Sequence, residues 1–144
     1  MRVESLLKND SLTPIQKIDI LIDEHIERVI HNDEFYKIML CEQVINKNPA
    51  IIKFLSEIKM RNAELINRLI ADGQKKGVFK KNIDVVMLMS TMVGTVIQVL
   101  IHQPFYKSFY GLKKMPDKEF ADTIQKKLSI HVKKIFKATL TNEV

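Results

Sequence analysis

Apolar residues recur every three or four positions along almost the whole chain, and no stretch alternates apolar with polar for long enough to predict a strand. Gly and Pro, the residues that most often end a helix, number only four each in 144 residues. A single helical period with few breaks predicts a small number of long helices. Because 46% of the residues are hydrophobic, these helices can bury one core, and we predict a single all-α domain over residues 1–144.

Local start and stop signals divide the chain into a helical bundle of five main helices after an N-terminal helix stub at residues 3–9. Thr13-Pro14 and Asn48-Pro49 each place a capping side chain before a proline, which is typical of a first helical turn. Asn82 or Asp84 caps a further helix, which runs to about residue 102. The lysines and glycines of residues 72–77 are typical of a helix end. The five helices are expected to begin near residues 14, 33, 49, 84 and 116.

The charge of the chain does not indicate a nucleic-acid-binding surface. The net charge is +6, and residues 104–144 hold most of the excess, with nine Lys or Arg against four Asp or Glu. This density is modest, so a solvated lysine face explains it better than a phosphate-binding block. A single cysteine, Cys41, allows no internal disulfide and fits a reducing compartment. With no leader pattern at the start, we expect a cytoplasmic protein.

The helix expected at residues 84–102 is apolar almost all round, which predicts burial on two sides. Its 17-residue apolar stretch is shorter than the roughly 18–20 residues of a membrane span, so no membrane segment is predicted. Three explanations account for the small and polar strip along one side: bonds from Thr91 and Thr95 back to their own helix, close approach of a second subunit at Gly94, or a ligand cavity. The strip consists of Asp84, Met87, Thr91, Gly94, Thr95, Gln98 and His102.

Sequence patterns of catalysis and of metal binding are missing. The glycines form neither a dinucleotide-binding loop nor a P-loop, and no Gly-x-Ser-x-Gly elbow occurs. The histidines match neither a zinc nor a di-iron spacing, and Cys41 has no second cysteine to pair with. His25 and His31 are expected at the surface. We therefore predict a protein that is not an enzyme and that uses no cofactor and no metal.

Residues 69–84 resemble a recurring joint in the tetracycline-repressor-like (TetR) family of bacterial transcription regulators. In that family a long helix ends in a Gly-x-x-x-Gly-x-Phe turn, here Gly73 to Phe79, and an Ile-Asp pair, here Ile83-Asp84, begins the next, apolar helix. The order of long and short helices is also similar to the family's C-terminal domain. The resemblance covers nearly the whole chain and implies that domain's all-α fold.

One departure from the family concerns DNA binding. Members carry an N-terminal helix-turn-helix with an Ala-Gly-Val-Ser-like turn, and this chain lacks that turn and begins on what resembles the connecting helix. We therefore expect residues 1–144 to be the effector-binding and dimerisation domain, with DNA contacted only through a missing N-terminal domain.

The resemblance implies a homodimer that pairs through its last two helices and binds a small, mostly apolar effector. An effector that binds one conformation of the domain more tightly would increase the population of that conformation and so reposition the DNA-binding domains of the full-length dimer. The implied ligand-binding residues are Met39, Phe54, Ile58, Asn62, Met87, Thr91, Thr95 and Gln98. The implied dimer-interface residues are Val93, Val96, Ile97, Leu100, Phe120, Ile124, Leu128, Ile135 and Phe136.

An alternative function is that of a helical adaptor. Residues 104–115 are rich in aromatic side chains and are expected to form a loop, in which Phe105, Tyr106, Phe109 and Tyr110 would bind a protein partner. The same four side chains could instead pack down as a lid over the mouth of a pocket.

Overall fold

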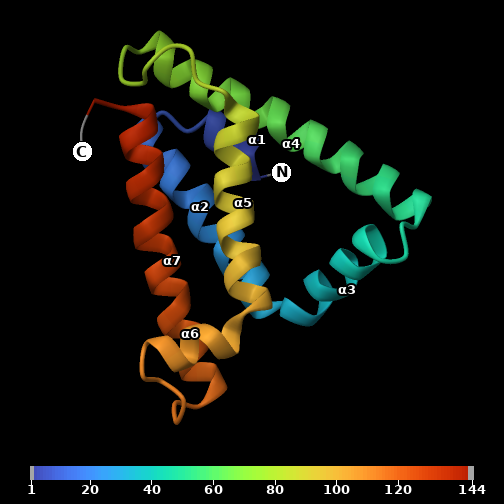
Figure 1. Ribbon diagram of the computed structural model, residues 1–144. Coiled ribbons are helices and arrows are strands. Elements are labelled where there is room, and N and C mark those ends of the chain that lie inside the picture. The colour runs from blue at the N-terminus through green and yellow to red at the C-terminus, as the bar shows by residue number, and fades with distance from the viewer. Residues whose placement is uncertain (1, 143–144) are drawn as a thin grey trace.

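A computed structural model describes residues 2–142, and within them it contains seven helices and no strand (Figure 1). This confirms the predicted all-α class. Five long or intermediate helices follow the short α1, as predicted, but the aromatic segment expected to be a loop contains a further helix, α6. The helices are α1 (Arg2–Leu7), α2 (Pro14–His31), α3 (Asp33–Val44), α4 (Pro49–Lys75), α5 (Val85–Ile101), α6 (Gln103–Phe109) and α7 (Asp117–Leu140).

The predicted caps begin three of the helices. At α2 the Gln16 backbone N–H donates to the Thr13 hydroxyl at 3.3 Å, and the Thr13 backbone N–H donates to the Gln16 side chain at 2.9 Å, which completes a capping box. The Asn48 side chain caps α4. Of the two candidates for α5, Asp84 is the cap, because its carboxylate accepts from the Met87 backbone N–H at 3.1 Å.

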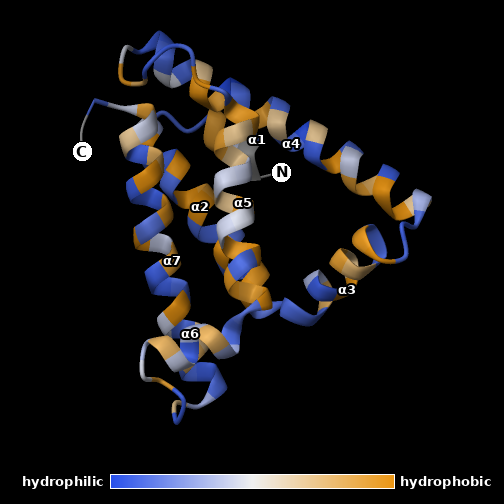
Figure 2. Ribbon diagram, in the orientation of Figure 1, coloured by the Kyte–Doolittle hydropathy of each residue, from blue (hydrophilic) through white to orange (hydrophobic). Residues whose placement is uncertain are grey.

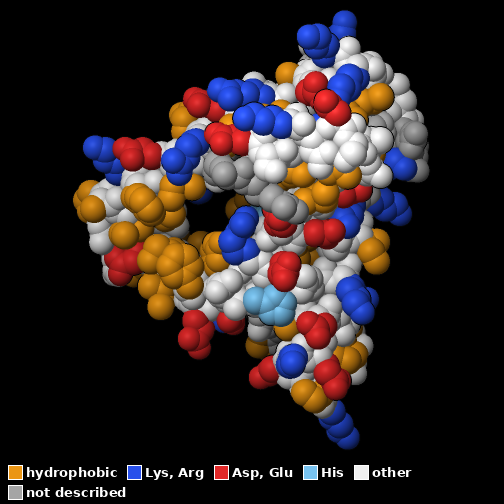
Figure 3. Space-filling model, turned by 180° about the vertical axis from the view of Figure 1, so that it is seen from behind, with side chains coloured by type: hydrophobic (Ala, Val, Ile, Leu, Met, Phe, Trp, Pro, Cys, Tyr) orange, Lys and Arg blue, Asp and Glu red, His pale blue; other side chains and the backbone are white. Residues whose placement is uncertain are grey.

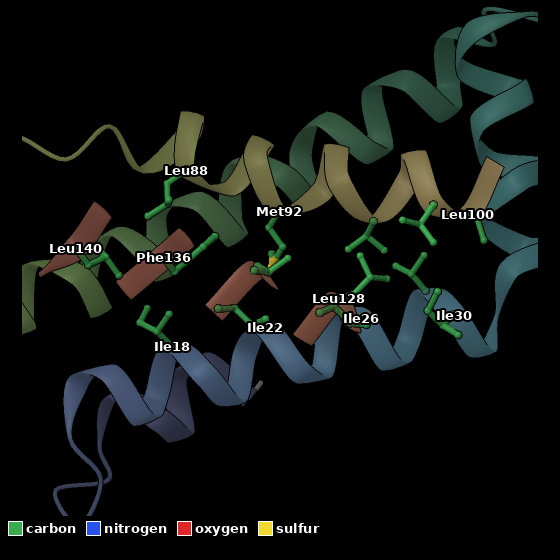
Figure 4. Packing of buried hydrophobic residues seen from close by; sticks show 14 of the residues in the cluster. Ile18, Ile22, Ile26, Ile30, Leu88, Met92, Leu100, Leu128, Phe136 and Leu140 are labelled. Carbon is green, nitrogen blue, oxygen red and sulfur yellow. The ribbon is translucent and has the colours of Figure 1, made fainter. Parts of the chain in front are cut away.

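One hydrophobic core lies between α2, α5 and α7. Figure 4 shows Ile18, Ile22 and Ile26 of α2 directed toward Met92 of α5 and Phe136 of α7. All are buried. Burial of each such side chain stabilises the fold by roughly 1.5–3 kcal/mol, so this three-helix contact is the main source of stability.

The joint between α4 and α5 is built from two glycines and a phenylalanine. The Phe79 ring is buried against Gly73, where a Cβ atom would overlap the ring. Gly77 has a φ of +76°, a left-handed conformation that ends the helix. The Lys80 backbone N–H then donates to the Leu140 carbonyl at 2.7 Å, which links the joint to the end of α7.

The α3 helix and the first half of α4 extend away from the core and form two sides of an open triangle (Figure 1). Among its residues, α3 buries none fully, and it exposes large apolar side chains such as Phe35 and Ile38. In α4 the fully buried residues begin only at Leu65. The α3 helix is therefore held far less firmly than α2, α5 or α7.

Candidate functional site

The triangle formed by α3, α4 and the core encloses an opening. Figure 3 shows, from behind, a gap that passes through the side chains, with apolar groups on its α3 and α4 borders. The four helices around it also carry apolar side chains that are only partly buried against the core: Leu21, Tyr36, Ile66, Met89, Val93 and Ile97. A concave, apolar surface between helices is where a small apolar molecule binds best.

The orientation of α5 determines which of its residues face this opening. Leu88 points toward Phe136 and Leu140 of α7 (Figure 4). Since successive helical residues are 100° apart, Met89 lies about a quarter turn around α5 from the side that faces α7, and Val93, four residues later, lies close to the same side as Met89. Thr91 lies 60° from Leu88 in the other direction, on the side of α5 opposite to Met89, which we call the outer side.

The eight predicted ligand-binding residues fall on two surfaces. Met39, Ile58 and Asn62 are half-buried on α3 and α4, and Ile58 and Asn62 continue the α4 stripe that leads inward to buried Leu65. Phe54 lies at the edge of this stripe and is exposed. The other four are on the outer side of α5, away from the opening: Met87, Thr91, Thr95 and Gln98.

His25 is a residue of α2 whose burial the sequence did not indicate. Its Nε2 is buried and has no hydrogen-bond partner among the described residues, so the expected surface position is wrong for His25, whereas His31 is exposed. Burial, and to a lesser extent the positive charge of Arg28, lower the pKa of His25 to about 4. The ring is therefore neutral at physiological pH. Only its position four residues after Leu21, on an inward side of α2, could have indicated it.

The polar strip of α5 satisfies its own hydrogen bonds. The Thr91 hydroxyl donates to the Met87 carbonyl at 3.0 Å, and the Thr95 hydroxyl donates to the Thr91 carbonyl at 2.7 Å. Internal bonding, the first of the three explanations, is thus confirmed for the two threonines. Figure 2 shows the strip as a pale stretch in the middle of an otherwise apolar helix. In a single chain this side of α5 is open to solvent, with Gly94 exposed and nothing within 4 Å of where its Cβ would lie.

The nine predicted dimer-interface residues lie mostly inside the chain itself. Six of them belong to the core: Val96, Leu100, Phe120, Ile124, Leu128 and Phe136. Val93, Ile97 and Ile135 are half-buried. A core side chain has no surface left for a second copy. On its outer side α5 exposes Met87, which is 62% exposed, together with Thr91 and Gln98.

The aromatic residues of α6 form a stacked and exposed cluster at the end of the bundle formed by α5 and α7 (Figure 1). Phe105 and Phe109 stack at 5.9 Å between ring centroids, and Phe109 is 74% exposed. Lys127 of α7 lies 4.4 Å from the centroid of the Tyr110 ring, a cation–π contact that fixes the cluster to α7.

Within residues 2–142 no group of three or more His, Cys, Asp or Glu side chains is placed to hold a metal ion. Over the same residues no single helix is long and apolar enough to cross a membrane. One bent pair, α5 with α6 at 80°, reaches the required length and composition.

Seven helices within residues 2–142, with a two-glycine joint before an apolar helix, place this chain in the class of all-α domains. The family described as tetracyclin repressor-like, C-terminal domain, matches residues 14–128. The chain therefore belongs to the TetR-like C-terminal domain family, a family of regulators and not of enzymes. Neither a search of curated proteins nor one of solved structures gave a significant match.

Proposed function

We propose that this chain is the effector-binding and dimerisation domain of a TetR-like transcription regulator. The observation that carries the proposal is the pair of unfilled surfaces on the two sides of α5. One side borders the opening, and the other exposes Met87, Gly94 and their neighbours to solvent. DNA contact would come from a separate domain, and a cytoplasmic location follows from that role.

The outer side of α5 supports dimerisation. Met87 is a large apolar residue that remains exposed in one chain, beside exposed Thr91 and Gln98, and association would remove it from water. Gly94 lies two turns after Met87 on the same side and would let a second helix approach closely. Because the predicted core residues cannot take part, we assign the contact to this exposed side, with α7 beside it.

Sedimentation velocity at micromolar concentration tests the dimer. The native chain should sediment as a dimer and Thr91→Lys as a monomer, because a long charged side chain would then face the partner. Thr91 is exposed in a single chain, so the variant should fold. Asn67→Lys, at an exposed position of α4, is the matched control and should remain dimeric. A monomeric native chain would contradict the proposal.

The opening supports effector binding. Its border carries many apolar side chains, and α3, which closes one side, buries no residue fully, so its movement would disturb little core packing beyond the contact of Tyr36. Asn62 and His25 add a small number of polar atoms to this border, the composition expected for a site that orients an apolar guest. Native mass spectrometry of the purified chain should detect a co-purified small molecule.

The exposed aromatic cluster of α6 favours a second candidate function, a protein-binding adaptor. Phe105 is 59% exposed and stacks on Phe109, which is an unusual arrangement for side chains with no partner. Phe105→Ser with Phe109→Ser separates the two functions. Loss of a pulled-down partner with the dimer intact would favour the adaptor, and an unchanged interaction profile would favour the regulator.

A further inference from the structure

We propose that His25 recognises the polar group of the effector, and that the effector is a neutral apolar molecule that carries a hydroxyl group. The inference rests on the proposal that the opening binds the effector, and it names the chemical class of that effector.

The contacts of α2 place His25 on the side of the opening. Asp23 accepts from the Ser129 hydroxyl at 2.5 Å and from the Lys133 ammonium at 2.6 Å, so this side of α2 faces α7. His25, two residues later, is 200° further around the helix. It therefore lies on the side away from α7, where Figure 1 shows α3 and α4. Leu21, one turn earlier, is partly buried on that side.

The Nε2 atom of His25 is an unsatisfied polar group. It is buried and without a hydrogen-bond partner among the described residues. A buried polar atom without a partner destabilises the folded chain, and an effector that forms a hydrogen bond with it would remove that penalty. Met89 and Val93 of α5 are apolar and offer no such bond.

The protonation state of His25 determines whether the site prefers an effector with a hydroxyl group or one with a carboxylate. Its pKa, lowered to about 4 by burial and then by Arg28, leaves the ring uncharged at pH 7. In a neutral imidazole one nitrogen donates and the other accepts, and a hydroxyl group can pair with either form because it both donates and accepts. A carboxylate would lose part of its hydration opposite an uncharged ring, and the one neighbouring cation, Arg28, is exposed and screened by water, so it compensates only in part. A neutral hydroxyl is therefore preferred.

Isothermal titration calorimetry at pH 7.5 with three matched probes tests this inference. The probes are butylbenzene, 4-butylphenol and 4-butylbenzoate, which share an apolar body and differ in one group. The native chain should bind the phenol about tenfold more tightly than butylbenzene, the equivalent of one hydrogen bond, and the benzoate most weakly. His25→Leu should remove the preference for the phenol, and His25→Gln, which can still donate and accept, should keep it.

The matched control is His31→Leu, on the same helix but exposed and bonded to Gln125 of α7. This variant should keep the tenfold preference. Equal binding of phenol and butylbenzene, a preference that survives His25→Leu, or tightest binding of the benzoate would each overturn the role of His25 while leaving an apolar site in place. Failure of all three probes to bind the native chain would overturn the effector role of the opening as well. A cooperative melting curve for each variant shows that the fold is retained.

Discussion

The Phe79 ring lies directly against Gly73, in the space that the Cβ of any other residue would occupy. Alanine normally stabilises a helix by about 1 kcal/mol relative to glycine. At this position overlap with the buried ring should outweigh that gain, and we expect Gly73→Ala to lower the free energy of unfolding by about 2 kcal/mol. Urea denaturation followed by circular dichroism measures the change.

A second glycine provides the opposite case. Gly94, in the middle of α5, has no atom within 4 Å of where its Cβ would lie. In a single chain Gly94→Ala should therefore be stabilising by up to about 1 kcal/mol. At a close helix contact between two copies the added methyl group should instead weaken association about tenfold. Sedimentation equilibrium gives the dissociation constant, and an unchanged value would place Gly94 outside the dimer contact.

The free energy of unfolding should vary with pH because the pKa of His25 differs between the folded and the unfolded chain. Its pKa is about 4 in the folded chain and near 6.5 when unfolded, so between these values the unfolded state binds more protons. Stability should therefore fall as the pH is lowered from about 6.5 toward 4, by up to about 3 kcal/mol from this group. His25→Leu should remove this component and exposed His31→Leu should not. Parallel curves for the native chain and His25→Leu would contradict the prediction.

The buried side chain of Lys17 should lower the free energy of unfolding of this chain. Its side chain is 0% exposed, and its Nζ has no hydrogen-bond partner among the described residues. An unpaired ammonium in a protein interior is costly, whereas methionine fills a similar volume without charge. We expect Lys17→Met to raise the free energy of unfolding by about 2 kcal/mol, as measured by denaturant titration.

The matched control for this substitution is Lys134→Met, on the exposed side of α7. It should change stability by less than about 0.5 kcal/mol. A clear loss of stability in Lys17→Met would indicate that the ammonium has a functional partner.

The parts of the fold that follow from short-range chemistry were predictable from the sequence. The capping box at Thr13, the cap at Asn48 and the left-handed Gly77 depend on residues within a few positions of one another. The apolar stripe of α2 likewise predicted the buried Ile18, Ile22 and Ile26. In each case the local pattern and the tertiary contacts favour the same structure.

The sides of α5 were harder to assign, because an almost uniformly apolar helix has a weak period. The pattern showed that Thr91 and Val93 lie on different sides, but not which of these sides faces α7. Val96 and Leu100 were expected between two subunits and instead fill the core of one chain. The α6 helix was also missed, since its seven residues are too few to show a period.

The hydrogen bond between Lys80 and Leu140 holds the joint after α4, and Leu65, Leu69 and Ile70 anchor the second half of α4 in the core. Residues 49–64 extend about 24 Å beyond this anchor, and their far end carries α3. A tilt of only about 5° at Leu65 would displace the far end by roughly 2 Å, because displacement grows with distance along a rigid rod. Small rearrangements near Leu65 would thus be largest at the loop that joins α3 to α4, while the anchored half of α4 stays nearly still.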